Sequence, residues 1–334
     1  MTRKGTGMLQ HRPIGQGRPV RPCRLAGWGT YLPDEVVTFG AQTRYRIPDG
    51  MSQLDMLAAA AEDALRRADL RPDDIDCIIA ACAAGLQPIP CTAALVMERV
   101  APRAGAAAFD VNSTCTSFIT AVDIASRYLA AGDYERVLIV SGDVGSRFLD
   151  AGHRESFELF SDAAAAVVLT REPGGDSDVA APGVLGSLQQ TWPAHAHDTE
   201  LRGGLSLHPA QSYADGDPSD FLFAMDGRRA LLGMLAVLPD FFTRFFDRVG
   251  LDLADVDLVV PHQASRALGI AMRRIGIPKD AYVDRVAEFG NMVSSSVPFM
   301  LATSLDERRI GPGDTIVLCG TAAGLTANAL ALRL

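Results

Sequence analysis

The sequence predicts an α/β fold built from two duplicated halves. Residues 70–79 (LRPDDIDCII) have the pattern of a helix end, an acidic turn and an apolar strand, and residues 251–260 (LDLADVDLVV) repeat that pattern. A second matched pair, 136–142 (RVLIVSG) and 314–320 (DTIVLCG), lies at nearly the same separation along the chain. Either pair alone could arise by chance, but two pairs at nearly one spacing indicate a repeated helix-and-strand unit.

Apolar runs of strand length alternate with helical patterns in each half. In the first half we predict strands at 23–30, 76–81, 106–111, 137–142 and 164–169, and helices at 52–68, 92–100 and 116–131. In the second half we predict strands at 184–189, 257–260, 281–283, 315–320 and 325–333, and helices at 227–248, 265–275 and 295–308. Continuous apolar strands of this kind are typical of buried, mostly parallel sheets that helices cover on both faces.

The domain organisation follows from this repeat. We predict an N-terminal half at 22–175, which carries a candidate nucleophile, and a C-terminal half at 176–334, which carries its candidate partners. Residues 1–21 are basic and contain Gly and Pro, so we expect a disordered or loosely docked arm. The segment 191–220 breaks the rhythm of strands and helices, and a loop of this length is usually functional, so we expect it to cover a substrate entrance.

The composition is that of an ordinary soluble globular protein, with 48% hydrophobic and 21% charged residues. A net charge of −9 argues against nucleic acid or an anionic membrane as the main partner. No run of about 18 apolar residues is present, so we expect no membrane span. The six cysteines show no CxxC spacing of a zinc site and no disulfide framework, which favours a reducing cytoplasm.

Cys115 is the first candidate for catalysis. An apolar strand ends at Val111, a small polar turn follows, and a helix begins near the cysteine. A thiol beside a helix N-terminus meets free N–H groups and the positive end of the helix dipole, which favour the thiolate. Such a thiolate is a nucleophile, and nearby N–H groups can hold an oxyanion. A buried structural cysteine is the alternative interpretation.

Two further strand ends carry chemically useful side chains. His262 follows the predicted strand 257–260, and Asn291 lies in a loop of small residues before a helix. In α/β folds, functional residues gather at the carboxyl ends of strands. A histidine can exchange a proton near neutral pH, and an asparagine amide can donate to a developing enolate oxygen. Taken singly, a histidine at a strand end is more often a hydrogen-bonded structural residue, and Gly-Asn is a common turn dipeptide.

These residues together resemble the active site of the thiolase-fold condensing enzymes, and among them β-ketoacyl-[acyl-carrier-protein] synthase III. The matching features are the Cys115 elbow, the stretches 261–264 (PHQA) and 290–291 (GN), the turn 320–326 (GTAAGLT) and the opening strand 27–33 (GWGTYLP). The resemblance extends over residues 22–334. It implies a thiolase-like five-layered αβαβα fold, two duplicated halves and a homodimer.

The resemblance also implies a mechanism and its substrates. Cys115 would take an acyl group from acyl-CoA or an acyl carrier protein, with the backbone N–H groups of Cys115 and Ala323 holding the oxyanion. His262 and Asn291 would bind the thioester oxygen of a malonyl carrier as it loses CO₂, and the product would be a β-ketoacyl thioester for fatty-acid or polyketide-type biosynthesis. Because two neutral donors suffice for an enolate, we expect no metal and no redox cofactor.

The chain departs from the family pattern at its acyl-donor site. Between Val37 and Arg44 it lacks the segment whose tryptophan and arginine grip the CoA nucleotide, so the donor is either a carrier-protein thioester or CoA bound differently. Alanines at 322–323 and the run 161–164 (SDAA) add methyl groups near the site, which is more typical of specialised metabolism. Ile89 matches a dimer-loop residue that enters the partner's acyl pocket, and Phe160 matches a pocket-wall aromatic. A dimer-contact aliphatic and a core Phe are the alternatives.

Other patterns leave further alternatives open. Arginines in an acidic chain could meet an acidic carrier protein or simply form a solvated face; they are Arg228, Arg229, Arg266, Arg273 and Arg274. The histidines at 195, 197 and 208 invite a metal site, but no further ligands stand at a definite spacing. An acyltransferase forming a C–O or C–N bond, a head-to-head acyl condensation, and a non-catalytic partner subunit are the competing functions. A hydrolase is disfavoured, since no carboxylate is evident to orient His262.

Overall fold

Two layers of a nine-stranded sheet and the helices around them form the molecule, and the computed structural model describes residues 21–173 and 181–334. In the first layer the strands are ordered β5 (Ala107–Asp110), β4 (Cys77–Ala80), β6 (Arg136–Asp143), β7 (Ala163–Arg171) and β1 (Arg21–Tyr31). In the second they are β11 (Leu258–Pro261), β12 (Thr315–Ala322), β13 (Thr326–Arg333) and β8 (Gly183–Thr191), with a single bridge from Val259 to Tyr282 as the fifth position. In the described part of the chain the layers are joined where Arg21 and Pro22 of β1 pair with β8.

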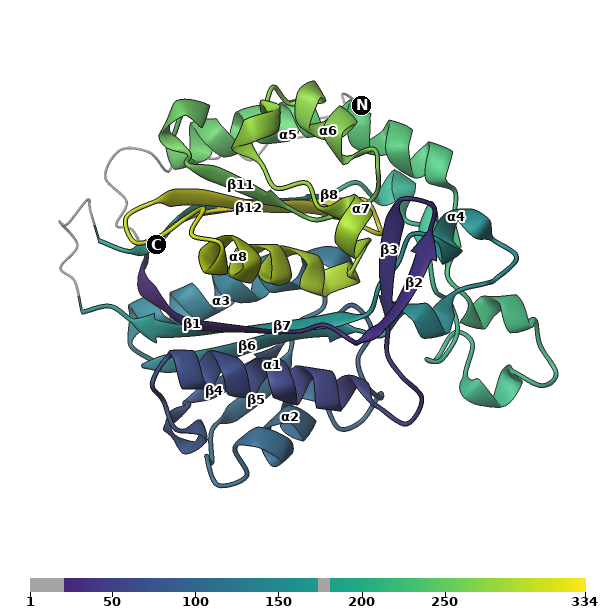
Figure 1. Ribbon diagram of the computed structural model, residues 1–334, viewed down its shortest axis with the longest axis horizontal. Helices are drawn as coiled ribbons and strands as arrows, with labels where there is room; N and C mark the ends of the chain where they lie inside the picture. The colour runs from purple at the N-terminus through teal and green to yellow at the C-terminus, as the bar shows by residue number, and fades with distance from the viewer. Residues whose placement is uncertain (1–20, 174–180) are drawn as a thin grey trace, which may run out of the picture.

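Helices fill the space between the layers and cover both outer faces. Figure 1 shows α3 (Ser117–Ala131) and α8 (Ser296–Asp306) in the middle, α1 (Gln53–Arg67) and α2 (Thr92–Val100) outside the first sheet, and α5 (Gly227–Val249) and α6 (Leu268–Arg274) outside the second. The apolar residues accordingly form one inner core around α3 and α8 and two outer cores under α1–α2 and α5–α6. This is the five-layered αβαβα arrangement that the family resemblance implied.

The repeated acidic motif has the same structural role in both halves. Asp76 accepts a hydrogen bond from the backbone N–H of Arg136 at 2.8 Å, and Asp257 accepts one from that of Thr315 at 2.8 Å. Two residues earlier, Asp74 and Asp255 each close a short 3₁₀ turn through a capping box. The aspartates therefore end a turn and fix the neighbouring strand, which explains why the motif precedes a buried strand twice.

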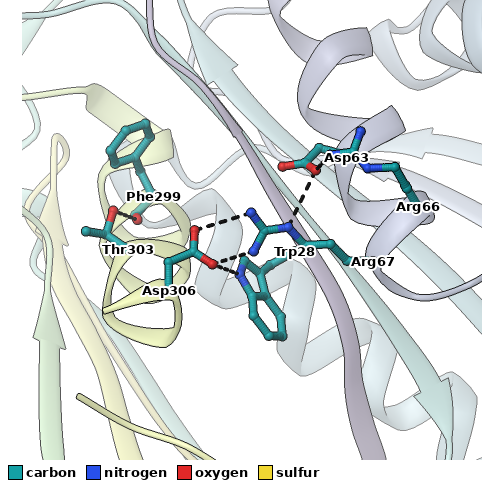
Figure 2. A network of polar contacts seen from close by, with 7 residues as sticks. All are labelled: Trp28, Asp63, Arg66, Arg67, Phe299, Thr303 and Asp306. Atoms are coloured by element: carbon teal, nitrogen blue, oxygen red, sulfur yellow. Dashed lines mark hydrogen bonds and ion pairs between the residues drawn. The ribbon is translucent and has the colours of Figure 1, made fainter. Parts of the chain in front are cut away.

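Close packing between α1 and β1 depends on glycine. A Cβ on Gly27 would lie 2.2 Å from the carbonyl oxygen of Ala64, and a Cβ on Gly29 would lie 2.2 Å from that of Ala60. The same region is tied to the second half by the network in Figure 2. There the indole Nε1 of Trp28 donates to Asp306 at 2.9 Å, and Arg67 stacks over the Trp28 ring at 5.4 Å while pairing with Asp306. One carboxylate on α8 thus binds both α1 and β1.

Three expectations from the sequence need correction. The sheets are mixed. Within the described residues the parallel strand pairs are β4·β5, β4·β6 and β11·β12, with a parallel bridge from Val259 to Tyr282, and the other strand pairs are antiparallel. For example, β12 turns directly into β13, and a tight turn forces antiparallel pairing. The predicted strand 281–283 is a single bridge at Tyr282, since Pro278 starts a 3₁₀ turn that takes up Ala281. The helix predicted at 265–275 begins only at Leu268.

The structure also adds elements that were not predicted. Strands β2 (Glu35–Phe39) and β3 (Gln42–Arg46) form a hairpin, and β9 (Thr199–Glu200) pairs with β10 (Ala224–Met225). Two short helices, α4 (Arg154–Phe157) and α7 (Val286–Phe289), lie beside the hairpin at one end of the layers (Figure 1).

Some expectations lie at or beyond the limits of the described residues. Arg21, which the prediction assigned to the arm, is the first residue of β1, and residues 1–20 of that arm lie outside the described part of the chain. The boundary predicted between 175 and 176 lies outside it as well. Within 21–173 and 181–334, no helix has both the length and the apolar character required to cross a bilayer.

Candidate active site

Cys115 lies in a strained turn between β5 and α3. The turn is a 3₁₀ segment, Thr114–Thr116, and Thr114 has a positive φ of 50°, which is rare for a β-branched residue. The Asn112 side chain maintains it, accepting from the N–H of Thr114 at 2.8 Å and donating to the carbonyl of Ala83 at 3.0 Å. Strain of this kind persists only where surrounding contacts impose it, and it is concentrated at functional sites.

The loop that carries Asn291 is a second copy of the same turn. Asn291 accepts from the N–H of Val293 at 2.9 Å and donates to the carbonyl of Ala264 at 3.1 Å, and Val293 has a φ of 52°. A 3₁₀ segment, Val293–Ser295, then leads into α8 as Thr114–Thr116 leads into α3. The Asn291 amide has two N–H donors, and Ala264 occupies one of them, so the other is available to a ligand.

His262 stands at the carboxyl end of β11 and is 3% exposed. Its backbone N–H donates to Cys319 at 2.8 Å, and a Cβ on Gly320 would lie only 2.8 Å from the His262 Cβ, so glycine at 320 makes room for the imidazole. Burial lowers the pKa of His262 to about 4, which leaves the ring neutral at physiological pH. Its Nδ1 is buried without a partner among the described residues, which favours the tautomer with the proton on Nε2.

One large cavity brings the predicted residues together. It has a volume of about 1640 Å³ and is lined by Cys115, His262, Asn291, Ala323 and Phe160. Phe160 is 5% exposed and lies beside Asn291, whose carbonyl accepts from the N–H of Ser161 at 2.9 Å. Ile89 does not line this cavity; its side chain is 84% exposed, and the neighbouring Pro88 lies at the cavity wall.

The thiol of Cys115 is protonated at neutral pH, contrary to the expectation that the helix terminus would favour thiolate. Burial raises the pKa of Cys115 to about 12, and the nearby Asp143 carboxylate adds to the rise. The backbone N–H groups of Cys115 and Ala323 act on the sulfur in the opposite sense, but they are outweighed. These two N–H groups lie at the sulfur, although they do not ionise the resting thiol.

The segment from Thr191 onward lies over the cavity as expected, and His195, Asp198, Glu200 and Leu205 contribute to its wall. Its histidines are engaged with carboxylates. His195 pairs with Asp198 at 2.7 Å, and His197 pairs with Glu200 at 3.0 Å. Within the described residues, no three His, Cys, Asp or Glu side chains are grouped so as to hold a metal ion.

The short segment at 37–44 has become the β2–β3 hairpin, and its turn from Phe39 to Gln42 lines the cavity. Arg44 is turned inward and is 0% exposed, donating to backbone carbonyls of Glu158, Thr43 and Val286 and to the Gln42 side chain. Burial lowers the pKa of Arg44 to about 10. This arginine therefore holds the loops beside Asn291 and does not extend toward a nucleotide. Of the five arginines singled out in the sequence, Arg266 lines the cavity.

Two residues of the cavity wall were missed by the sequence analysis. Asp143, 2% exposed, accepts from the N–H groups of Ala83 and Ala84 through one oxygen and from Ser294 through the other. It thereby connects the loop after β4 to the turn of Asn291. An aspartate at the end of an apolar strand was the available signal. The second missed residue is Thr114, which lines the cavity directly before Cys115. Its position next to the nucleophile was the one signal for it in the sequence.

Comparisons with known proteins agree on one family. The family model described as 3-oxoacyl-[acyl-carrier-protein] synthase III matches residues 109–183, and the model of its C-terminal part matches residues 246–334. The chain is 33% identical to the β-ketoacyl-[acyl-carrier-protein] synthase III of Sinorhizobium medicae, over 92% of this chain and 98% of the relative. It is 32% identical to β-ketoacyl-[acyl-carrier-protein] synthase III 3 of Streptomyces coelicolor, over 93% and 97%.

Solved structures give the same picture. The 3-oxoacyl-(acyl carrier protein) synthase III of Pseudomonas aeruginosa matches with a TM-score of 0.81 and 28% identity, covering 93% of this chain and 98% of that one. The corresponding enzyme of Aquifex aeolicus matches with a TM-score of 0.79 and 26% identity, covering 93% and 100%. The five-layered arrangement of the chain is therefore that of these proteins.

Proposed function

The chain belongs to the 3-oxoacyl-[acyl-carrier-protein] synthase III family and is an acyl-transferring condensing enzyme, and on that premise we propose that Cys115, His262 and Asn291 are its catalytic residues. The observation that supports this assignment most strongly is their convergence. Three side chains from three separate loops, which follow β5, β11 and α7, line one cavity, and the N–H of Ala323 faces the Cys115 sulfur within it.

In the first half-reaction, the Cys115 sulfur attacks the carbonyl carbon of an acyl thioester. The N–H groups of Cys115 and Ala323 hold the oxyanion that forms, and collapse of this intermediate breaks the bond to the departing sulfur. The proton of the Cys115 thiol ends on the departing thiol. His262 is neutral at physiological pH, because burial lowers its pKa to about 4, and it serves as a hydrogen-bond donor through Nε2.

In the second half-reaction, a malonyl thioester enters and loses CO₂. The N–H donors of His262 and Asn291 bind its thioester oxygen and stabilise the enolate that decarboxylation produces. The enolate carbon attacks the acyl-Cys115 carbonyl, a carbon–carbon bond forms, and the Cys115 sulfur leaves and regains a proton. The released product is a β-ketoacyl thioester, and neither half-reaction requires a change of oxidation state.

The partners follow from the relatives' names and from the cavity. We expect the malonyl group to arrive on an acyl carrier protein and the acyl group to arrive on CoA or on a carrier. The cavity wall carries Arg154 and Arg266, either of which can meet a phosphate of the pantetheine arm. We also expect a cytoplasmic homodimer, in which the edge strand β5 and the exposed Ile89 contact the second copy.

The test follows CO₂ release and acylation together. The purified protein is supplied with acyl-CoA or acyl-carrier donors and with malonyl-CoA or malonyl carrier, while mass spectrometry records the adduct on Cys115. We expect an acylated Cys115, CO₂ and a β-ketoacyl product, and in Cys115→Ala the adduct and the β-ketoacyl product should be lost. An acylated Cys115 with no CO₂ from any malonyl donor would contradict condensation and favour acyl transfer to oxygen or nitrogen. No adduct at all, with a partner protein acylated instead, would favour a non-catalytic subunit.

A further inference from the structure

A second imidazole lies in the cavity wall, and the proposed reaction does not use it. His195 lines the cavity, and 30% of its side chain is exposed. Its Nδ1 lies 2.7 Å from Oδ2 of Asp198, a residue that is only 5% exposed. Its Nε2 has no hydrogen-bond partner among the described residues and is not buried. One ring nitrogen is therefore fixed by a carboxylate, and the other is accessible to a ligand.

Several contacts hold this ring in place. Gly233 on α5 makes room for it, because a Cβ there would lie 2.7 Å from Cε1 and 2.9 Å from Nδ1 of His195. Arg229 pairs with Oδ1 of Asp198 at 3.0 Å, so both carboxylate oxygens are engaged. The backbone N–H of His195 donates to the carbonyl of Trp192 at 3.1 Å. The orientation of the ring is thus fixed by its own helix seat, its carboxylate and its backbone.

The carboxylate determines what Nε2 can do. An ionised Asp198 only accepts, so in the neutral ring Nδ1 carries the proton and Nε2 presents a lone pair. His262 has the opposite arrangement, with an unpartnered Nδ1 and the proton on Nε2. One cavity therefore holds an imidazole that donates and another that accepts. The group that complements His195 is an N–H or O–H of the bound substrate.

His195 lies beside the turn that carries Ala323. The N–H of Trp192 donates to the carbonyl of Leu325 at 2.9 Å, and the 3₁₀ segment Pro193–His195 begins at the next residue. Leu325 in turn is two residues beyond Ala323. A thioester whose carbonyl is held by the Ala323 N–H has the first atoms of its arm in this region. The first donor on that arm is the pantetheine amide N–H, whose nitrogen is three bonds from the sulfur in CoA and in acyl carrier proteins alike.

We propose that Nε2 of His195 accepts a hydrogen bond from the pantetheine amide nearest the thioester sulfur, and that Asp198 holds the ring in the tautomer this contact needs. His195 is then a binding residue for both substrates, and Asp198 is its positioning residue. This inference rests on the proposed role of Cys115 as the acyl carrier. An amide N–H that enters the cavity without an acceptor loses its hydrogen bond to water, so the contact favours amide-bearing thioesters by about tenfold.

The experiment uses two acetyl thioesters of the same shape. One is S-acetyl-N-acetylcysteamine, and the other is its ester analogue, in which an oxygen replaces the amide N–H. Mass spectrometry gives the rate of Cys115 acylation at low thioester concentration, divided by the rate of each thioester with free cysteine. In the native protein we expect the amide thioester to react about tenfold faster than the ester analogue. His195→Phe should remove this difference.

Two further variants sharpen the test. Asp198→Asn should also remove the difference although it keeps the imidazole. Arg229 can only donate, so the new amide oxygen faces Arg229 and its N–H₂ group faces Nδ1, which moves the ring proton to Nε2. His197→Phe is the matched control, because His197 is 88% exposed, pairs with Glu200 and does not line the cavity. This variant should keep the tenfold difference.

Three outcomes would overturn the inference. They are equal rates for the two thioesters in the native protein, a difference that persists in His195→Phe, or a fall by the same factor for both thioesters in that variant. The last outcome would assign His195 to the structure of the wall or to proton transfer. Failure of the proposed function looks different, because neither thioester would then acylate Cys115, and both proposals would be lost. Acylation of Cys115 without an amide preference would refute the role of His195 alone.

Discussion

Cys115 and Ser294 occupy equivalent positions in two copies of one turn. Each follows an asparagine and a β-branched residue with positive φ, and each precedes one of the two central helices. The environments differ. Cys115 lines the cavity, whereas Ser294 is 0% exposed and bonded to Asp143 and, at 2.9 Å, to Ser141. One copy of the turn therefore presents the Cys115 thiol to the cavity. The other presents the amide of Asn291, while the hydroxyl of Ser294 is held inside the protein.

Replacing Asn291 by Asp should separate the two half-reactions. The Asn291→Asp side chain keeps the oxygen that accepts from the N–H of Val293, but it loses the N–H donors. We expect condensation to fall by about 10²- to 10³-fold, as when one oxyanion donor is removed, while acylation of Cys115 continues. The measurement is CO₂ release alongside the mass of the acylated protein. Undiminished CO₂ release would show that this amide does not bind the enolate.

Adding a methyl group at position 320 should displace the imidazole of His262 while residue 262 itself stays unchanged. In Gly320→Ala the new Cβ would lie 2.8 Å from the His262 Cβ, so the imidazole must shift. A misplacement of about 1 Å at a reacting group lowers the rate by about 100-fold, so we expect the condensation rate to fall by about this factor. Gly311→Ala is the matched control, because a Cβ there meets nothing within 4 Å. Similar condensation rates for Gly320→Ala and Gly311→Ala would argue against a positioned His262.

The ionisation of Cys115 should be visible in its alkylation by iodoacetamide. With a pKa of about 12, the thiolate fraction, and hence the rate, should rise about tenfold per pH unit from pH 7 to pH 10 with no plateau. Asp143→Asn should speed alkylation at a fixed pH, because the Asp143 carboxylate contributes to the raised pKa of Cys115. Asp110→Asn serves as the control carboxylate. A plateau below pH 9 would indicate an ordinary thiol and would contradict the assignment.

Stability should depend on pH through His262. Its pKa is 6.5 in the unfolded chain and about 4 in the folded protein, so the unfolded state binds more protons between these values. The free energy of unfolding therefore falls as pH drops from 6.5 toward 4, by a total of about 3 kcal/mol. Urea unfolding of the native protein and of His262→Gln at pH 7 and pH 5 measures this. The variant should lose less stability between the two pH values, and an equal loss in both proteins would exclude His262 as the source.

Much of the fold could be predicted because local signals and tertiary contacts agree. The acidic motifs at Asp76 and Asp257 mark the same turn and strand in each half, and both side chains fix a neighbouring strand. Helix α2 (Thr92–Val100) lies where its apolar period placed it. The β2–β3 hairpin was missed, because most of its residues are only partly buried and give no apolar pattern. The contacts of its buried residue, Arg44, are with carbonyls of Glu158 and Val286, which are distant in the sequence.

The sequence by itself determined most of the strands and helices, the repeated acidic turn, and the positions of Cys115 and His262 after strands, because periodicity and turn chemistry are local. Only the tertiary structure decided the mixed pairing of the sheets and the protonated state of Cys115, since strand pairing and burial depend on distant residues. It alone left the Thr114 hydroxyl buried without a partner among the described residues, beside hydroxyls that are bonded. Whether a polar group has a partner depends on what the fold places beside it.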